Sequence, residues 1–176
     1  MLNENEFLYF AYGSNMSVER LVSRTPSARV VATGYVPGHR LVFDKFSQKD
    51  GSGKCDCERT DARDDSVCGV LYAIAEADRH ALDKAEGAGY GYEPGQVNVE
   101  TEQGPVLALT YIATDKRQGL YPYHWYKNHV LVGARQAHLP ASYITAIEQV
   151  QSIDDPDSKR VAQESRTYDV RTSQQR

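Results

Sequence analysis

The sequence predicts an α+β domain in which a curved, mixed β-sheet or small β-barrel is flanked by helices. Short apolar runs bounded by glycine, proline or polar clusters are typical of strands. They lie at residues 7–12, 28–36, 39–46, 67–75, 96–101 and 105–113. Helical patterns or helix signals occur at residues 18–24, 76–85, 123–137 and 140–150, and the chain shows no internal repeat.

In the first half of the chain, turn and capping residues separate the expected elements. Ser17 is a suitable N-cap for a short helix that ends before Pro26. Pro37 and Gly38 divide two strands. Residues 47–66 are rich in Lys, Asp, Gly and Ser, so we expect an exposed loop that could include a short strand around residues 55–57.

In the second half, glycine and proline again mark the boundaries. A Gly-rich segment at 87–95 ends the helix over 76–85, and Gln103-Gly104 joins two strands in a hairpin. Pro140 suits the first turn of a helix that continues to about Val150. Apolar residues become sparse beyond Ser152. We therefore expect a domain over residues 1–155 and a C-terminal helix or tail over 156–176, partly mobile in its last ten or so residues.

Composition narrows the class of protein. The net charge is −4 with a pI near 5.7, and the scattered Lys and Arg residues form no nucleic-acid footprint. The N-terminus is acidic and no run of about 18 apolar residues occurs, so neither a signal peptide nor a membrane span is expected. Three cysteines, an odd number, fit a reducing compartment. These features predict a cytoplasmic protein.

Residues 7–16 form the most informative segment. A buried strand runs directly into Gly13, where the chain can turn sharply, and small polar residues follow at Ser14 and Asn15. Amide N–H groups in such a loop can bind a carboxylate or a developing oxyanion. An ordinary strand-to-helix turn has the same pattern, and the segment alone does not distinguish the two.

Glu86 is the candidate catalytic residue. It ends its helix just before the Gly-rich segment and borders the apolar face. The negative end of the helix dipole and partial burial would both disfavour a charged carboxylate there, which suits a general base. The alternative is a solvated glutamate at a helix end.

Two other patterns point away from a bound cofactor or metal. Residues 87–95 follow a helix and precede a strand, the reverse of a dinucleotide-binding loop, and are better interpreted as a flexible loop over a pocket lined by Tyr90 and Tyr92. Cys55, Cys57 and Cys68 match no standard zinc spacing. We expect neither cofactor nor metal.

Taken together, four segments resemble the γ-glutamylcyclotransferase family over about residues 6–155. Residues 7–15 (FLYFAYGSN) are similar to the family's first strand and Tyr-Gly-Ser-Asn loop, and residues 69–72 (GVLY) to its central strand. Residues 82–87 (LDKAEG) resemble the segment that carries the family's catalytic glutamate. The C-terminal helical region matches at Trp125-Tyr126-Lys127, Gly133-Ala134, Leu139-Pro140 and Ser142-Tyr143. The chain departs from the family at residues 55–58 and at Cys68.

The resemblance implies cyclisation of a γ-glutamyl amide, a small-molecule substrate, to 5-oxoproline with loss of its amine and without a cofactor. Glu86 would be the catalytic residue. The substrate-binding residues would be Tyr9, Phe10, Ala11, Tyr12, Gly13, Ser14, Asn15, Tyr92 and Tyr126. A homodimer is a further implication of the resemblance.

Two alternatives remain open at this point. The same fold could serve as a non-catalytic module that binds a small molecule or a partner. An enzyme of this class could instead be directed to γ-glutamylamines or to glutathione. The lining of the leaving-group pocket would separate these enzymes, and we expect residues 87–95 and 47–66 to form it.

Overall fold

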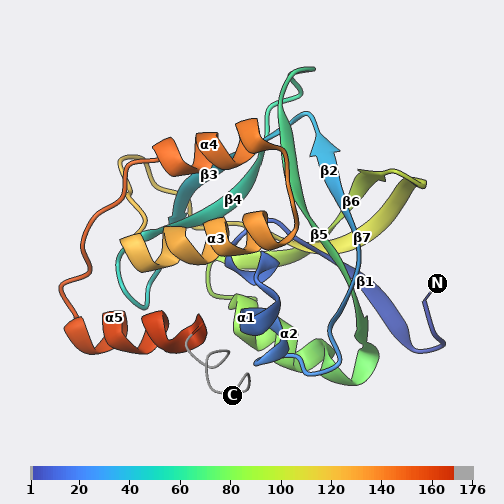
Figure 1. Ribbon diagram of the computed structural model, residues 1–176, viewed down its shortest axis with the longest axis horizontal. Coiled ribbons are helices and arrows are strands. Elements are labelled where there is room, and N and C mark those ends of the chain that lie inside the picture. The colour runs from blue at the N-terminus through green and yellow to red at the C-terminus, as the bar shows by residue number, and fades with distance from the viewer. Residues whose placement is uncertain (1, 169–176) are drawn as a thin grey trace, which may run out of the picture.

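The computed structural model describes residues 2–168 and contains a closed barrel, which confirms the predicted fold class (Figure 1). Around the barrel the strands are β1 (Glu6–Ala11), β5 (Ser66–Ala75), β2 (Arg29–Pro37), β6 (Tyr92–Thr101) and β7 (Gly104–Ala113). Strand β1 pairs antiparallel with β5 and parallel with β7, where Tyr9 pairs with Leu109 to close the barrel. The sheet is therefore mixed.

Glycines allow the barrel strands to approach closely. Gly34 of β2 and Gly69 of β5 are paired in register. A Cβ atom on Gly69 would lie 2.4 Å from the carbonyl oxygen of Ala11, and one on Gly34 would lie 2.5 Å from the carbonyl oxygen of Glu100. Side chains at these two positions would force the strands apart. The two glycines therefore allow β5 to approach β1 and β2 to approach β6.

Strands β3 (His39–Phe46) and β4 (Gly53–Arg59) form a separate two-stranded sheet. The short strand expected around residues 55–57 is present within β4, but the expected exposure of this segment was wrong, because Cys55, Asp56 and Cys57 are all buried. The Asp56 carboxylate accepts hydrogen bonds from Lys116 at 2.6 Å and from the Ala113 amide at 3.1 Å. Partners about 60 residues away thus pair the buried charge of a strand that is itself held by β3.

Helices cover one side of the barrel (Figure 1). They are the short 3-10 turns η1 (Ser14–Met16) and η2 (Glu76–Asp78) and the helices α1 (Val18–Val22), α2 (Arg79–Glu86), α3 (His124–Gln136), α4 (Ala141–Gln149) and α5 (Ser158–Ser165). Helix α3 packs directly on η1, and Gly133 allows this close approach, since a Cβ atom there would lie 2.5 Å from the Ser17 amide nitrogen.

Strand β6 begins at Tyr92, so the Gly-rich loop is shorter than expected.

Helix α5 is tied to the body of the molecule by Glu164. This carboxylate accepts from Arg20 Nη1 at 2.7 Å and from His129 Nε2 at 2.9 Å. The other ring nitrogen of His129 contacts the Tyr168 hydroxyl at 2.7 Å. Residues 156–168 are thus packed against α1 and α3, whereas the predicted mobile end falls largely on residues 169–176, outside the described part of the chain.

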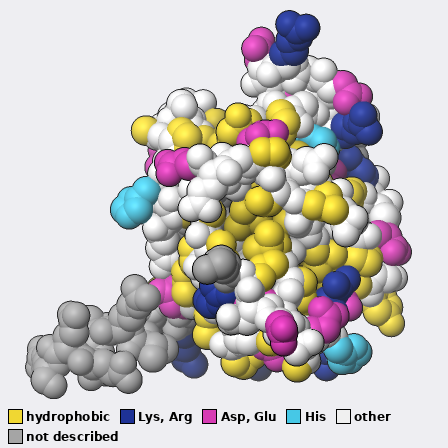
Figure 2. Space-filling model, turned by 90° about the vertical axis from the view of Figure 1, so that its right-hand side faces the viewer, with side chains coloured by type: hydrophobic (Ala, Val, Ile, Leu, Met, Phe, Trp, Pro, Cys, Tyr) yellow, Lys and Arg dark blue, Asp and Glu magenta, His cyan; other side chains and the backbone are white. Residues whose placement is uncertain are grey.

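One side of the barrel carries exposed hydrophobic side chains, as Figure 2 shows for the face toward the viewer. Those on β2 and β7 are Val30, Val31, Tyr35, Leu107 and Ile112. Among residues 2–168, no helix has the length and apolar content that crossing a bilayer requires.

We expect Glu164→Gln to destabilise the protein by about 2 kcal/mol at pH 7, because the variant loses charge-assisted hydrogen bonds. Burial would raise the pKa of Glu164, but the His129 hydrogen bond and the Arg20 charge outweigh it and lower this pKa from 4.5 to about 2. A depressed pKa stabilises the fold above pH 4.5 and ceases to do so as the pH falls toward 2. Urea unfolding should therefore show the two proteins converging below pH 4.5.

Glu148→Gln is the control, since Glu148 forms an exposed ion pair with Arg135. A difference between wild type and Glu164→Gln that stays constant from pH 7 to pH 3 would contradict the role given to Glu164.

Candidate active site

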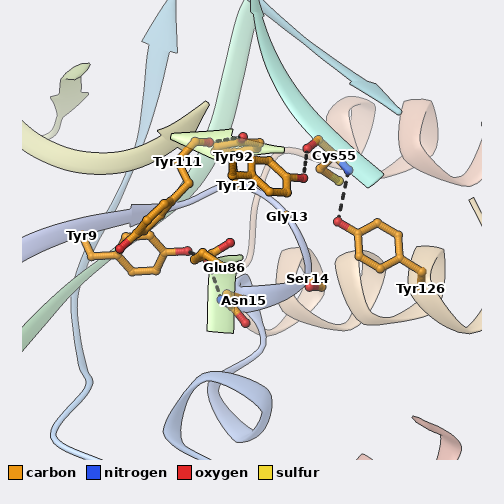
Figure 3. Close-up of a pocket in the computed structure, with 10 residues that line it drawn as sticks. All are labelled: Tyr9, Tyr12, Gly13, Ser14, Asn15, Cys55, Glu86, Tyr92, Tyr111 and Tyr126. Carbon is orange, nitrogen blue, oxygen red and sulfur yellow. Dashed lines mark hydrogen bonds between the residues drawn. The ribbon is translucent and has the colours of Figure 1, made fainter. Parts of the chain in front are cut away.

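A cavity opens where β1 leaves the barrel and α2 ends (Figure 3). Strand β1 and the turn after it bring one group of lining residues, α2 brings Glu86, and β4, β6, β7 and α3 complete the wall. The lining residues are Tyr9, Tyr12, Gly13, Ser14, Asn15, Cys55, Glu86, Tyr92, Tyr111 and Tyr126. The structure thus brings together segments that are far apart in the sequence.

The end of α2 places Glu86 at this cavity. Gly87 adopts a left-handed conformation with φ of 71°, and its amide donates to the Lys84 carbonyl at 3.2 Å. The Ala88 amide donates to the Asp83 carbonyl at 2.9 Å. These bonds satisfy carbonyls of the last turn and stop the helix immediately after Glu86. The Glu86 side chain lies beside Tyr9 and Asn15 (Figure 3).

Two donors hold one oxygen of the Glu86 carboxylate. The Tyr9 hydroxyl and Asn15 Nδ2 both donate to Oε1, the latter at 2.6 Å. Arg24 Nη1 donates to Asn15 Oδ1 at 2.9 Å, and because a guanidinium can only donate, it fixes the Asn15 amide with its NH₂ toward Glu86. Oε2 of Glu86 has no hydrogen-bond partner within residues 2–168. One carboxylate oxygen is therefore fixed and the other is available.

Tyr9 acts as a neutral donor in this arrangement. Burial raises the pKa of its hydroxyl well above 10, and the neighbouring Glu86 charge raises it further. The same burial effect raises the pKa values of Tyr12, Tyr92 and Tyr126. Near neutral pH these phenols keep their protons and can donate hydrogen bonds.

The turn after β1 supplies backbone donors on the other side of the cavity. The amides of Gly13 and Ser14 donate to no other group in the part of the chain that the structure describes. A Cβ atom on Gly13 would lie 3.1 Å from Cys55 Cβ, so a glycine lets the turn pack against β4. Two residues with unpaired N–H groups thus line a cavity that Glu86 also lines.

Hydrogen bonds fix the aromatic wall of the cavity. The Tyr12 hydroxyl donates to the Tyr111 carbonyl at 2.5 Å, and the Tyr92 hydroxyl donates to the Cys55 carbonyl. From the opposite side, the Tyr126 hydroxyl accepts from the Cys55 amide at 3.1 Å (Figure 3). These contacts link β1, β4, β6, β7 and α3 around one small space.

Cys55 is placed at the cavity but is not suited to nucleophilic attack. Burial raises the pKa of its thiol to about 12. A thiolate is the reactive form of cysteine, and almost none of it is present near neutral pH.

Within residues 2–168, no three His, Cys, Asp or Glu side chains lie close enough together to bind a metal ion. Glu86 is the lining residue best suited to accept a proton.

Most of the residues proposed from the sequence lie at the cavity, with three exceptions. Phe10 and Ala11 are buried but do not line it, since Phe10 lies on the opposite face of β1 and contacts the Gly69 region. Tyr90, which we expected to line a pocket, is 72% exposed. The cavity also includes Tyr111 and Cys55, which the sequence analysis did not select.

A second cavity of about 190 Å³ adjoins the first, which is smaller at about 30 Å³. The residues Ser14, Glu86, Tyr92 and Tyr126 line both. The outer cavity continues over β3, the loop before β4, α1 and α5, where its lining is largely charged. Glu86 thus lies at the junction of an inner and an outer space.

Comparisons with known proteins agree with this architecture. The model of the AIG2-like family matches residues 66–147. The chain is 29% identical over 151 residues to the bovine γ-glutamylcyclotransferase, covering 84% of this chain and 80% of the relative. The human γ-glutamylcyclotransferase is also 29% identical, with 86% and 82% covered. A solved structure of a γ-glutamyl cyclotransferase superposes with a TM-score of 0.80 at 26% identity, covering 92% of this chain and 99% of that one.

We expect iodoacetamide at pH 8 to modify Cys68, which is partly exposed, well before Cys55 or Cys57 in the native protein. With a pKa of about 12, only about one Cys55 thiol in 10⁴ is ionised at that pH, and burial blocks access. Peptide mass spectrometry with and without urea would measure this. Modification of native Cys55 at the rate of a free thiol would show that the cavity wall opens readily.

Proposed function

The chain belongs to the γ-glutamylcyclotransferase family, and we propose that it converts a γ-glutamyl amide into 5-oxoproline and the free amine. The bovine and human relatives are named for this activity, and the match to this chain covers most of the length of each. The proposal takes Glu86 as the catalytic residue and the turn at Tyr12, Gly13 and Ser14 as the substrate-binding loop.

One observation supports this assignment above the others. Glu86 has Oε1 held by Tyr9 and Asn15, while Oε2 is unpaired beside a cavity that also contains the Gly13 and Ser14 amides. A proton acceptor and a pair of donors therefore share one small space. Cyclisation of a γ-glutamyl group needs both.

In the proposed reaction, the α-amine of the substrate attacks the γ-carbonyl carbon of the same γ-glutamyl group. The α-ammonium first gives a proton to Oε2 of Glu86, which frees the nitrogen lone pair. A bond from nitrogen to carbon forms, and the carbonyl electrons move onto oxygen. When the tetrahedral carbon collapses, the amide C–N bond breaks and Glu86 returns its proton to the departing nitrogen. The ring nitrogen passes its second proton to the same amine through Glu86, so that the amine leaves as an ammonium and the lactam nitrogen keeps one hydrogen. No water is consumed.

Besides proton transfer, the protein has to orient the substrate and stabilise the charge that develops on the carbonyl oxygen. The nucleophile is tethered to the carbonyl that it attacks, and tethering can lower a barrier by about 7–11 kcal/mol. The Gly13 and Ser14 amides would bind the α-carboxylate or the tetrahedral oxygen. The Tyr126 hydroxyl would face a polar group of the substrate, and Tyr92 would close the wall beside it.

The location and assembly of the protein stay predictions. Three free cysteines suit the cytoplasm, where the sequence analysis places the chain. The homodimer implied by the family resemblance is likewise untested.

Glu86→Gln should lower the rate of 5-oxoproline release by about 10²–10⁴-fold, because an amide cannot carry the proton. The side chain keeps its shape, so the thermal unfolding midpoint should change little. The measurement is chromatographic assay of 5-oxoproline with γ-glutamyl-alanine and related substrates. Glu93→Gln, at an exposed position on β6, is the matched control. Full activity in Glu86→Gln would remove the assignment.

Tyr9→Phe should lower kcat by up to about 100-fold with a smaller effect on KM, because Glu86 loses a positioning donor while the cavity keeps its lining. Tyr90→Phe removes an equivalent hydroxyl from an exposed residue outside the cavity and should leave the kinetics unchanged. Steady-state kinetics of both variants compare the two hydroxyls. Equal behaviour of the two variants would exclude a role for the Tyr9 hydroxyl in orienting Glu86.

A further inference from the structure

The outer cavity is rich in positive charge. Cationic side chains come from α1 and the turn after it, from β3, β4 and the loop between these strands, and from α5. They are Arg20, Arg24, Lys45, Lys49, Lys54 and Arg160. Three acidic residues also line it, namely Asp50, Glu86 and Glu164. The lining therefore carries six cationic groups against three carboxylates, although the whole chain has a net charge of −4.

Local ion pairs account for part of this charge. Lys54 pairs with Asp50 at 2.8 Å, and Arg20 pairs with Glu164 at 2.7 Å. Arg160 pairs with Asp155, which lies outside the cavity lining. These contacts leave Arg24, Lys45 and Lys49 without a carboxylate partner among residues 2–168.

Lys45 is the most informative of these residues because it is only 6% exposed. Its Nζ atom lies 3.5 Å from the Tyr90 carbonyl oxygen and 4.7 Å from the centre of the Tyr92 ring. Neither contact supplies a negative charge, and burial lowers the pKa of the amine. The charges of Asp115, Asp50 and Glu86 act on the amine from a distance, but none of these carboxylates forms an ion pair with it within residues 2–168. A buried cation without a direct ion pair is costly to the fold, and an anionic ligand would lower that cost.

Two arginines that line the same cavity also have incompletely paired guanidinium groups. Arg24 is half-buried, and the carbonyl oxygen of Asn15 is its one hydrogen-bond acceptor within the described chain. Arg20 lines the same cavity, and its buried Nε atom has no hydrogen-bond partner in residues 2–168. Incompletely paired cations thus come to the cavity from α1, from the residues just after it and from β3.

We propose that the outer cavity binds the leaving group and selects amines that carry carboxylates, with an acidic amino acid such as glutamate preferred to a neutral one. The inference rests on the proposed function. Glu86 lines both cavities, so a γ-glutamyl group reacting in the inner cavity would direct its leaving group into the outer one. The α-carboxylate of the leaving amino acid and its side-chain carboxylate would then meet Lys45, Arg20 and Arg24.

This assignment makes the cationic residues determinants of specificity rather than of the chemical step. The γ-glutamyl group has its own α-carboxylate, but the inner cavity already offers the Gly13 and Ser14 amides to that group. The outer cations are therefore free to distinguish one leaving group from another. Exposed Lys49 at the cavity mouth would add to the attraction of anionic substrates.

The test uses substrates that share the γ-glutamyl group and differ in the charge of the leaving group. These are γ-glutamyl-ethylamide, γ-glutamyl-alanine, γ-glutamyl-glutamine and γ-glutamyl-glutamate, with 5-oxoproline release as the readout. Glutamine and glutamate leaving groups have nearly the same shape, so the ratio of their kcat/KM values measures the effect of one negative charge. We expect kcat/KM for the glutamate substrate to exceed that for the glutamine substrate by about tenfold, and this ratio to fall in high salt.

Lys45→Met should bring that ratio close to one, mainly by raising KM for γ-glutamyl-glutamate. Lys84→Gln removes the same charge from an exposed position two residues before Glu86 and outside both cavities, and should leave the ratio unchanged. Inhibition of the wild-type protein by free glutamate compared with free glutamine measures the same preference without a variant, in case Lys45→Met does not fold.

The outcomes separate the two proposals. Turnover of the panel with no preference for carboxylated leaving groups would overturn the specificity inference and leave the proposed function in place. An equal loss of kcat/KM for every substrate in Lys45→Met would also overturn it, because Lys45 would then bind the shared γ-glutamyl group. The absence of 5-oxoproline from every substrate, with folded protein, would overturn the proposed function itself.

Discussion

The candidate site depends on the hydrogen bonds that join the first strand to the end of helix α2. Tyr9 and Asn15 meet Glu86 across separations of 77 and 71 residues in the chain. Both donors approach the same carboxylate oxygen, so the carboxylate is held in one orientation while its other oxygen stays available. A carboxylate held this way is pre-organised for proton transfer, which a solvated side chain is not. Arg24 extends the arrangement by fixing the Asn15 amide.

Close backbone packing allows Tyr9 and Asn15 to reach Glu86. Gly69 lets β5 approach the end of β1, and Gly133 lets α3 pack against the turn at η1. The turn is therefore held from two sides, which fixes Ser14 and Asn15 relative to the barrel. The barrel and its helices thus act as a rigid support for a loop of a few residues.

Charge is distributed unevenly around the site. The inner cavity is walled by tyrosines whose burial keeps them neutral, whereas the outer cavity holds cations that the chain does not fully neutralise. The division matches the needs of the proposed reaction. In the proposed reaction, proton transfer would take place among neutral donors and one carboxylate, and the leaving group would be recognised where charge can discriminate.

The sequence by itself determined the local features of this protein. Apolar runs and their turn residues gave the strands and the fold class, Gly13 marked the turn after β1, and Gly87 marked the end of the helix that carries Glu86. Each is visible because a left-handed cap, a sharp turn or a buried strand limits which residues can occupy it.

Only the tertiary structure decided which distant groups come into contact. Lys116 pairs the buried charge of Asp56 in β4, and pairing within the barrel turns Phe10 away from the site. Packing brings Tyr111, Cys55 and Lys45 to the cavities. Such contacts arise between segments far apart in the chain, and no local pattern encodes them.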